Sequence, residues 1–98
     1  MNISIDGLDV PGEGWLKRVV GTAVTQRVII AGKGTGVPYR DAPRLVARYG
    51  GEFGDWQKVR GNISLDYHGV ARPAEAHWAQ EMSLGGPFEE KFKCWLGT

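Results

Sequence analysis

The sequence predicts a single α+β domain in which one or two N-terminal helices pack on a curved antiparallel sheet of three to four strands, arranged as a meander. A helix with start and end signals lies at residues 40–51, and three segments with strand periodicity follow from residue 55 onward. In addition, 15 glycines and 5 prolines favour short elements and tight loops. Because 98 residues suffice for one domain with a small core, we expect residues 1–98 to fold as a unit.

The first third of the chain allows more than one structure. Residues 1–14 alternate weakly and then break at Pro11 and Gly12, which predicts either an ordered arm or one extra strand. Residues 15–32 place apolar side chains at helical spacing, although they are also rich in Val, Ile and Thr, which favour strands. We expect a helix from about residue 13 to residue 20, with a longer helix to residue 30 as the alternative.

The segment RDAPRLVARYGG, residues 40–51, carries the signals of a short helix. Asp41 can cap its first turn by accepting backbone N–H bonds, and Pro43 is tolerated there because that turn does not need the missing N–H. Gly50 or Gly51 then ends the helix in a left-handed conformation. The apolar stripe that we expect to be buried consists of Leu45, Val46 and Tyr49.

Three segments after residue 55 have the period-two pattern of strands: DWQKVRGNISLDY, PAEAHWAQEM and FEEKFKCWL. HGVARP forms a hairpin loop between the first two segments, and SLGGP turns the chain into the third. Gly61 and Asn62 indicate a bulge in the first strand. The helix at residues 40–51 is the natural cover for one face of this meander.

The strand PAEAHWAQEM, residues 73–82, separates into a dry face and a wet face. The dry face consists of Ala74, Ala76 and Trp78. The wet face consists of Glu75, His77 and Glu81. An imidazole is therefore expected between two carboxylates on the solvent side of the sheet.

His77 is the strongest candidate for a catalytic residue, because histidine is the side chain whose charge changes near neutral pH. Glu75 is within reach to orient the ring, and a carboxylate with an imidazole suffices for acid–base cleavage of RNA, in which the 2′-hydroxyl is the nucleophile. The phosphate also needs cations from the neighbouring strands. The candidates are Lys58 and Arg60 on one side and Lys91 and Lys93 on the other. The simpler interpretation is a strand histidine that pairs with its acidic neighbour for solubility.

The glycine-rich segment GKGTG, residues 32–36, begins a second candidate region. Lys33, Tyr39 and Arg40 make a basic and aromatic cluster suited to a phosphate and a stacked base. A plain hinge, with a tyrosine that packs under the loop, is the alternative. His68 lies in the loop DYHGVARP and is either a substrate contact or a polar turn residue.

Composition excludes several classes of function. Twelve basic and 11 acidic residues give a net charge of +1, which excludes a strong nonspecific field for polyanions but not a local basic patch. The single cysteine, Cys94, cannot form an internal disulfide, and we expect it to be a small buried hydrophobe. With two histidines and no second thiol, we expect no metal and no cofactor. No apolar run approaches the ~20 residues of a membrane span, and MNISIDGLDV lacks the features of a signal peptide.

Three segments in order resemble one family: GTGVPYRDAPRLVARYGGEFGDWQKVRGN, then DYHGVARPAEAHWAQE, then FEEKFKCWL. They are similar to C-terminal toxin domains of bacterial polymorphic toxins, the tips of Rhs-type and contact-dependent inhibition proteins. Those domains have a helix that ends in Tyr-Gly-Gly, a D-W-x-K-V segment, a hairpin, an H-W strand and a basic terminal strand. Here these features fall at residues 40–51, at residues 55–59, at His77 with Trp78, and at Phe92 with Lys93. The resemblance covers about residues 34–96.

The resemblance implies a ribonuclease effector that acts on RNA, tRNA included, and is neutralised by a cognate immunity protein. Such a domain is monomeric when free and acts in the cytoplasm of a target bacterium. It is exported only as part of a larger protein or by a secretion system. The resemblance implies that His77 is the catalytic position, and Glu75 and Lys58 are further candidates to which no family motif assigns a role.

Two further functions remain open on the sequence. The first is a non-enzymatic module that docks a protein partner through exposed tryptophans, namely Trp15, Trp56 and Trp95. The second is an immunity-like protein, although inhibitors of basic nucleases are usually acidic and this chain is not.

Overall fold

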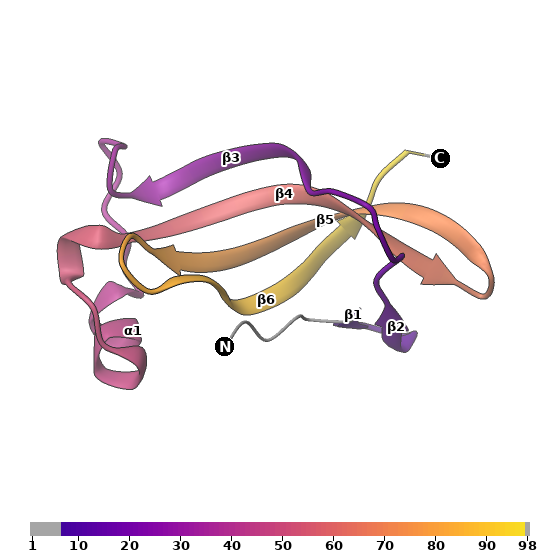
Figure 1. The fold of residues 1–98 in the computed structure, drawn as a ribbon, viewed down its shortest axis with the longest axis horizontal. Coiled ribbons are helices and arrows are strands. Elements are labelled where there is room, and N and C mark those ends of the chain that lie inside the picture. The colour runs from indigo at the N-terminus through magenta and orange to yellow at the C-terminus, as the bar shows by residue number, and fades with distance from the viewer. Residues whose placement is uncertain (1–6, 98) are drawn as a thin grey trace.

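The computed structural model describes residues 7–97, and in them it contains one α-helix, one short 3₁₀ turn and six strands (Figure 1). In chain order the elements are β1 Gly7–Val10, β2 Gly14–Lys17, β3 Thr25–Gly32, α1 Ala42–Tyr49, the 3₁₀ turn Phe53–Asp55, β4 Trp56–Tyr67, β5 Val70–Glu81 and β6 Gly85–Trp95. The predicted α+β class is confirmed, with a single helix in the described part of the chain.

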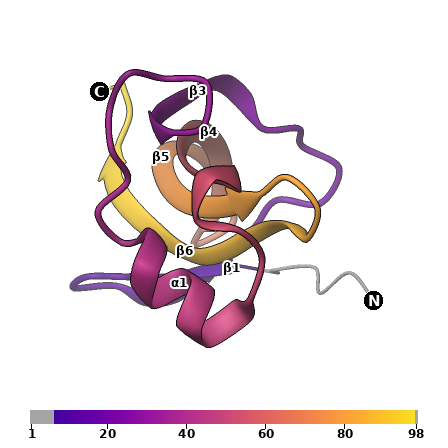
Figure 2. The same ribbon diagram turned by 90° about the vertical axis from the view of Figure 1, so that its left-hand side faces the viewer.

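The main sheet has the strand order β3-β4-β5-β6, and all neighbours are antiparallel, so the predicted meander is confirmed with four strands. β4 and β5 form its centre and pair residue by residue from Trp56 opposite Glu81 to Tyr67 opposite Val70. β3 and β6 lie on opposite sides of this pair (Figure 2). The hairpin loop is shorter than predicted, since only His68 and Gly69 separate the two strands.

A first hydrophobic core lies on the face that the alternation predicted to be dry. The main sheet contributes buried apolar side chains from β4 and β5, and the two-stranded sheet of β1 and β2 covers them. Its buried members are Leu8, Val10, Leu16, Val59, Ile63, Leu65, Ala74, Ala76 and Trp78. The assignment of Ala74, Ala76 and Trp78 to the buried face is therefore confirmed.

A second, smaller core lies where α1 meets the first residues of β4, at the end of the long strands opposite the β4–β5 turn (Figure 1). Leu45 from α1 and Trp56 from β4 are fully buried in it, together with Ala42 and Ala79. Tyr39, Val46, Tyr49 and Phe88 pack around these residues. The helix thus covers one end of the sheet and leaves the middle of its face open.

The helix ends as predicted but begins differently. Gly50 has a φ of 93°, and its N–H bonds to the Val46 carbonyl, which confirms a glycine of positive φ after the last turn. Pro43 lies in the first turn, as expected. The predicted side-chain cap is wrong, because Asp41 makes no cap hydrogen bond and has helical φ and ψ angles of −83° and −6°.

The helix predicted from about residue 13 to 20, or to 30, is wrong. That stretch forms β2 and β3, separated by a break at Gly21, which has a φ of 82°. Of the apolar side chains at helical spacing, Leu16 and Ala31 are buried but Val20, Val24 and Val28 are exposed, so a helix here would have no continuous packing partner. β-Branched residues without such a partner favour strands. Of residues 1–14, β1 realises the extra strand that we considered, while residues 1–6 lie outside the described part.

The predicted bulge at Gly61 and Asn62 is also wrong for the β4–β5 pair, in which both residues keep register. The register shifts lie in β3 instead, between Thr25 and Val28 and between Ile29 and Ala31. Gly61 has a packing role, because a Cβ atom there would lie 2.7 Å from Cη2 of the Trp78 indole and 2.7 Å from Cγ1 of Val24. Glycine at this position therefore leaves room for the Trp78 indole beside β4.

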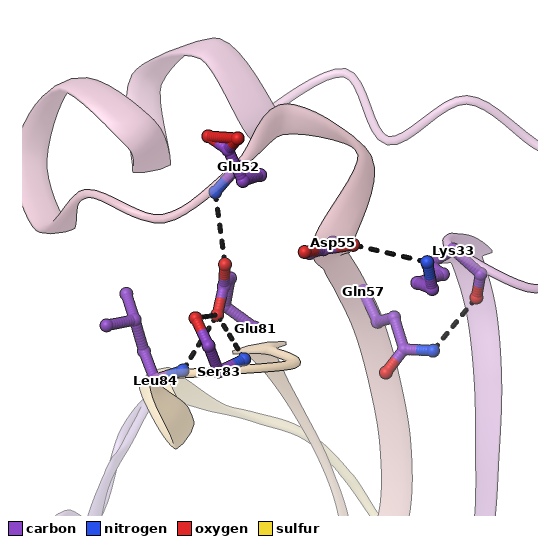
Figure 3. Close-up of polar contacts among 7 residues, drawn as sticks. All are labelled: Lys33, Glu52, Asp55, Gln57, Glu81, Ser83 and Leu84. Atoms are coloured by element: carbon purple, nitrogen blue, oxygen red, sulfur yellow. Dashed lines mark hydrogen bonds and ion pairs between the residues drawn. The ribbon is translucent and has the colours of Figure 1, made fainter.

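Glu81 was predicted on the wet face, but it is 1% exposed. Its carboxylate accepts hydrogen bonds from the Glu52 N–H at 3.0 Å, from the Leu84 N–H at 2.7 Å, and from the Ser83 N–H and hydroxyl at 2.6 and 2.8 Å (Figure 3). It therefore joins the β5–β6 turn to the segment between α1 and β4. Burial alone would raise the pKa of Glu81, but these hydrogen bonds outweigh it and lower the pKa from 4.5 to about 2.

Replacing Gly61 by alanine is expected to lower the free energy of unfolding by about 1–3 kcal/mol, because the buried indole of Trp78 cannot move aside without disturbing the first core. Urea denaturation measures this difference. Gly36→Ala is the matched control, since a Cβ at Gly36 meets no atom within 4 Å, and its effect should stay below about 0.5 kcal/mol. Equal stability of Gly61→Ala and the parent would contradict this account.

The native carboxylate of Glu81 predicts a specific loss of stability in acid. Because its pKa is about 2 in the folded chain and 4.5 is its ordinary value, its contribution is complete above about pH 5 and is lost as the pH falls from 4.5 toward 2. Glu81→Gln should lower the midpoint of thermal unfolding at pH 7 by roughly 10 °C. The difference between the unfolding midpoints of the parent and the variant should become smaller in acid. Thermal melts from pH 7 to pH 2.5 test this, with the exposed Glu52→Gln as control. A difference in midpoint that is independent of pH would show that the charge of Glu81 does not stabilise the fold.

Candidate functional site

Two rows of side chains cross the uncovered middle of the sheet on the face that carries His77. Residues directly opposite each other in antiparallel strands project to the same face, with Cβ atoms about 4.5–5.5 Å apart. The first row runs through the paired residues Val28, Arg60, His77 and Lys91. The second row runs through Thr25, Asn62, Glu75 and Cys94. The register thus places a cation on each side of His77 and puts Glu75 in the adjoining row.

His77 and Glu75 form the predicted acid–histidine pair. Nε2 of His77 lies 2.8 Å from Oε2 of Glu75, and the two side chains are 21% and 20% exposed. An ionised carboxylate only accepts hydrogen bonds, so Nε2 is the donor and Nδ1 keeps a free lone pair in the neutral ring. Within residues 7–97, Nδ1 makes no hydrogen bond. The ring is therefore oriented by Glu75 and has one nitrogen available to take a proton.

A cleft of about 300 Å³ opens beside His77, between the residues that lead into α1 and strand β6. Four cationic side chains and two carboxylates line it, so it is locally basic although the whole chain carries only +1. The cations are Arg44, Lys58, Lys91 and Lys93, and the carboxylates are Asp41 and Glu89. A basic cleft of this size suits one phosphate with its attached group.

One wall of the cleft is held by a network between α1 and β6. The guanidinium of Arg44 donates two hydrogen bonds to the carboxylate of Glu89, both at 2.9 Å. The Tyr49 hydroxyl donates to Glu89 Oε2 at 3.0 Å and accepts from Nε of Arg48 at 3.0 Å. The hydrogen bonds from Arg44 lower the pKa of Glu89, and the hydroxyl of Tyr49 adds to this effect. The network ties β6 to the helix and fixes the shape of the wall.

Tyr39 lines the same cleft from the loop before α1. Burial raises the pKa of its hydroxyl to about 12, and the negative charges of Asp41 and Glu89 add to the effect, against a smaller opposing contribution from Arg44. Tyr39 therefore keeps its proton at neutral pH and can act as a hydrogen-bond donor in the cleft.

The structure brings together only part of the predicted site. His77, Lys58, Lys93 and Tyr39 line the cleft. Glu75 reaches the cleft through its bond to His77, and Arg60 lies beside His77 on β4 without lining the cleft.

Three predicted residues lie elsewhere. Nζ of Lys33 is 3.2 Å from Asp55 Oδ1, and its carbonyl accepts from Nε2 of Gln57 at 2.9 Å, so its position is structural (Figure 3). Arg40 is exposed and does not line the cleft. His68 lies in the β4–β5 turn at the far end of the strands, with Nε2 3.9 Å from Glu13.

Sequence reasoning missed Arg44, Asp41 and Glu89 as cleft residues. Arg44 and Asp41 had been interpreted only as parts of a helix, and nothing local in the sequence shows that this helix begins next to β6. Glu89 was missed because its contacts with Arg44 and Tyr49 depend on tertiary packing.

The prediction that Cys94 is buried is wrong, because the thiol is exposed. A register shift in the β5–β6 pair puts Cys94 opposite Glu75 and Phe92 opposite Ala76. Phe92 and Cys94 therefore lie on opposite faces, although their spacing of two suggests one face. Phe92 packs against the first core, whereas Cys94 faces solvent next to the acid–histidine pair.

The tryptophans do not form the docking patch that was considered. Trp56 is fully buried, and the Trp95 ring packs against Phe92 with centroids 5.1 Å apart and against Tyr67 at 5.5 Å. The Arg72 guanidinium also covers Trp95, 4.2 Å from the ring centroid. Trp15 is the most exposed of the three, at 55%. A surface anchored by Trp15, Trp56 and Trp95 together is therefore excluded.

Residues 7–97 lack two further features. No helix among them is long and apolar enough to cross a membrane. No group of three or more His, Cys, Asp or Glu side chains among these residues is arranged to hold a metal ion.

Comparisons with protein-family models, with curated proteins and with solved structures found no match to this chain. Function must therefore be inferred from the side chains themselves and from how the register assembles them.

The exposure of Cys94 predicts that its thiol reacts in the folded protein with Ellman's reagent, at a rate close to that of the unfolded chain. The absorbance of the released product, followed with and without denaturant, measures both rates. A reaction that starts only after denaturant is added would mean that the thiol is buried and that the register of β6 is different.

Proposed function

We propose that this chain is a ribonuclease that cleaves RNA without a metal ion, by acid–base chemistry in which the 2′-hydroxyl of the substrate is the nucleophile. The observation that carries the proposal is the His77–Glu75 pair beside a cleft lined by Lys58, Lys91 and Lys93. A base, a means of orienting it and cations for a phosphate are the groups that this reaction requires.

In this reaction Nδ1 of His77 accepts the proton of the 2′-hydroxyl. The 2′-oxygen attacks the adjacent phosphorus, the bond from phosphorus to the 5′-oxygen breaks, and that oxygen leaves with a proton from an ammonium group of the cleft. The products are a 2′,3′-cyclic phosphate and a free 5′-hydroxyl. Glu75 acts as a positioning residue, because a group hydrogen-bonded to His77 at 2.8 Å cannot also reach the leaving oxygen on the far side of the phosphorus.

The cations hold the phosphate and stabilise the charge of the pentavalent transition state. Lys91 is paired with His77 across the β5–β6 ladder, and Lys58 and Lys93 complete the same cleft. Arg60, which is paired with His77 from the β4 side, extends this positive strip across the sheet toward the next phosphate of the chain.

The resemblance of residues 34–96 to polymorphic toxin domains supports a biological setting for this activity. In that setting the chain is a toxin that enters the cytoplasm of a target bacterium as part of a larger protein or through a secretion system. Cellular RNA such as tRNA is its substrate, and a cognate immunity protein, binding the free monomer, protects the producing cell.

RNA cleavage in the presence of EDTA tests the proposal. His77→Ala should lower kcat/KM on total RNA or tRNA by about 10²–10⁴-fold, because the general base is removed. His68→Ala is the matched control, since it removes the other histidine from an exposed turn far from the cleft and should leave kcat/KM unchanged. Product fragments resolved on a gel give both rates, and mass spectrometry identifies the cyclic phosphate. Absence of cleavage by the parent chain, or equal cleavage by His77→Ala, would reject the proposal.

A further inference from the structure

Asp41 occupies the position where an aspartate usually caps a helix, yet its side chain serves another purpose. The residue has helical backbone angles and makes no hydrogen bond to the first turn of α1. Its carboxylate, 57% exposed, lines the His77 cleft instead. A side-chain cap hydrogen bond therefore does not account for a carboxylate at this place.

The carboxylate of Asp41 also has no hydrogen-bond donor among residues 7–97. Its nearest cation is Nη2 of Arg44 at 3.8 Å, which is too long for a hydrogen bond. Arg44 is committed to Glu89 by two bonds of 2.9 Å, so its guanidinium is not free to turn toward Asp41. Both oxygens of Asp41 thus remain acceptors inside a cleft whose other charged groups are mainly cations.

An aromatic ring lies close to this carboxylate. Tyr39 lines the same cleft, is partly buried and packs against the second core, so its ring is held in place. Tyr39 and Asp41 are two residues apart in the chain, and both line this cleft. A fixed aromatic ring in a basic groove is a typical platform for an unpaired base.

We propose that Tyr39 and Asp41 form a nucleobase subsite of the cleft, which accepts a single-stranded nucleotide and favours guanine. The inference rests on the proposed ribonuclease function. Tyr39 stacks on the base, and the two oxygens of Asp41 accept hydrogen bonds from N1–H and N2–H of guanine.

Guanine is favoured because it presents two adjacent donors on its pairing edge, which match the two acceptors of a carboxylate. Adenine and cytosine each place a ring nitrogen acceptor beside their amino group, and uracil flanks its one N–H with two carbonyl oxygens. A carboxylate gains one hydrogen bond at most from each of these bases and faces a lone pair beside it. A good bidentate pair is worth roughly 1–3 kcal/mol of discrimination, or about 5- to 150-fold.

Single-stranded RNA is the substrate because of the size and position of the cleft. A volume of about 300 Å³ admits one nucleotide, and the wall formed by α1 and β6 closes one side. A base that stacks on Tyr39 must be free of its pairing partner, so a duplex cannot place a base there without opening.

Asp41→Asn tests the subsite, with Arg40→Gln as the matched control at an exposed neighbour outside the cleft. The ends of fragments cut from an RNA of mixed sequence, read by sequencing, give the base preference of each variant. The parent and Arg40→Gln should cut next to guanine with at least about fivefold preference. Asp41→Asn should still cut RNA but should lose this preference. Because the Asp41 side chain makes no hydrogen bond to the helix, the thermal unfolding of Asp41→Asn should match that of the parent.

A binding experiment decides the subsite independently of turnover. Guanosine and uridine monophosphates are titrated into His77→Ala and into His77→Ala with Asp41→Asn, and binding is followed by calorimetry or by NMR shifts. Guanosine monophosphate should bind His77→Ala about tenfold more tightly than uridine monophosphate, and Asp41→Asn should remove the difference. Equal binding of both, or cleavage with an unchanged base preference in Asp41→Asn, would overturn the subsite and leave the ribonuclease function standing. Guanine-selective binding without any RNA cleavage would support the subsite and reject the ribonuclease function.

Discussion

The twelve residue pairs between β4 and β5 hold the molecule together and set the chemistry of its open face. A slip of one residue would exchange the two faces of a strand. It would then bury His77 and Glu75 under the β1–β2 hairpin and expose Ala74, Ala76 and Trp78. The uninterrupted ladder prevents this, because every residue from Trp56 to Tyr67 has one partner on β5. The same ladder places Arg60 next to His77, so the register that stabilises the core also assembles the candidate site.

The two hydrophobic cores lie on opposite faces and toward opposite ends of the central strands. The hairpin of β1 and β2 covers one face along Val59, Ile63 and Leu65, whereas α1 covers the other face only around Trp56 and Ala79. The rest of this second face is left without a cover, and His77 lies there at the margin of the helix. A small domain with one helix thus obtains both a packed interior and a cleft. The buried carboxylate of Glu81 secures the loops at the helical end, where β5 turns into β6.

Features encoded by local sequence could be predicted, whereas features set by register shifts and by tertiary packing could not. The helix at residues 40–51 has its own end signals, and the faces of β5 follow from strict alternation, so the His77–Glu75 pair was visible in advance. The helix prediction for β3 is wrong because its apolar residues fit the helical period as well as the strand period. Their exposure follows from the position of β3 at the edge of the sheet. Cys94 changed faces because a register shift in β6 breaks the alternation that its spacing implies. Alternation along β5 places Glu81 on the same face as Glu75. The loops at the end of the strand nevertheless bury Glu81, and no local sequence pattern predicts that burial.

The exposed position of Cys94 makes its thiol a natural labelling site next to the cleft. It is the one thiol in the sequence, it is exposed, and it faces Glu75 across the β5–β6 ladder. A fluorophore or spin label coupled to this thiol would lie beside the His77–Glu75 pair, and no cysteine would have to be introduced to attach it. The native chain thus carries its own attachment point for a probe that senses changes in the environment of this pair.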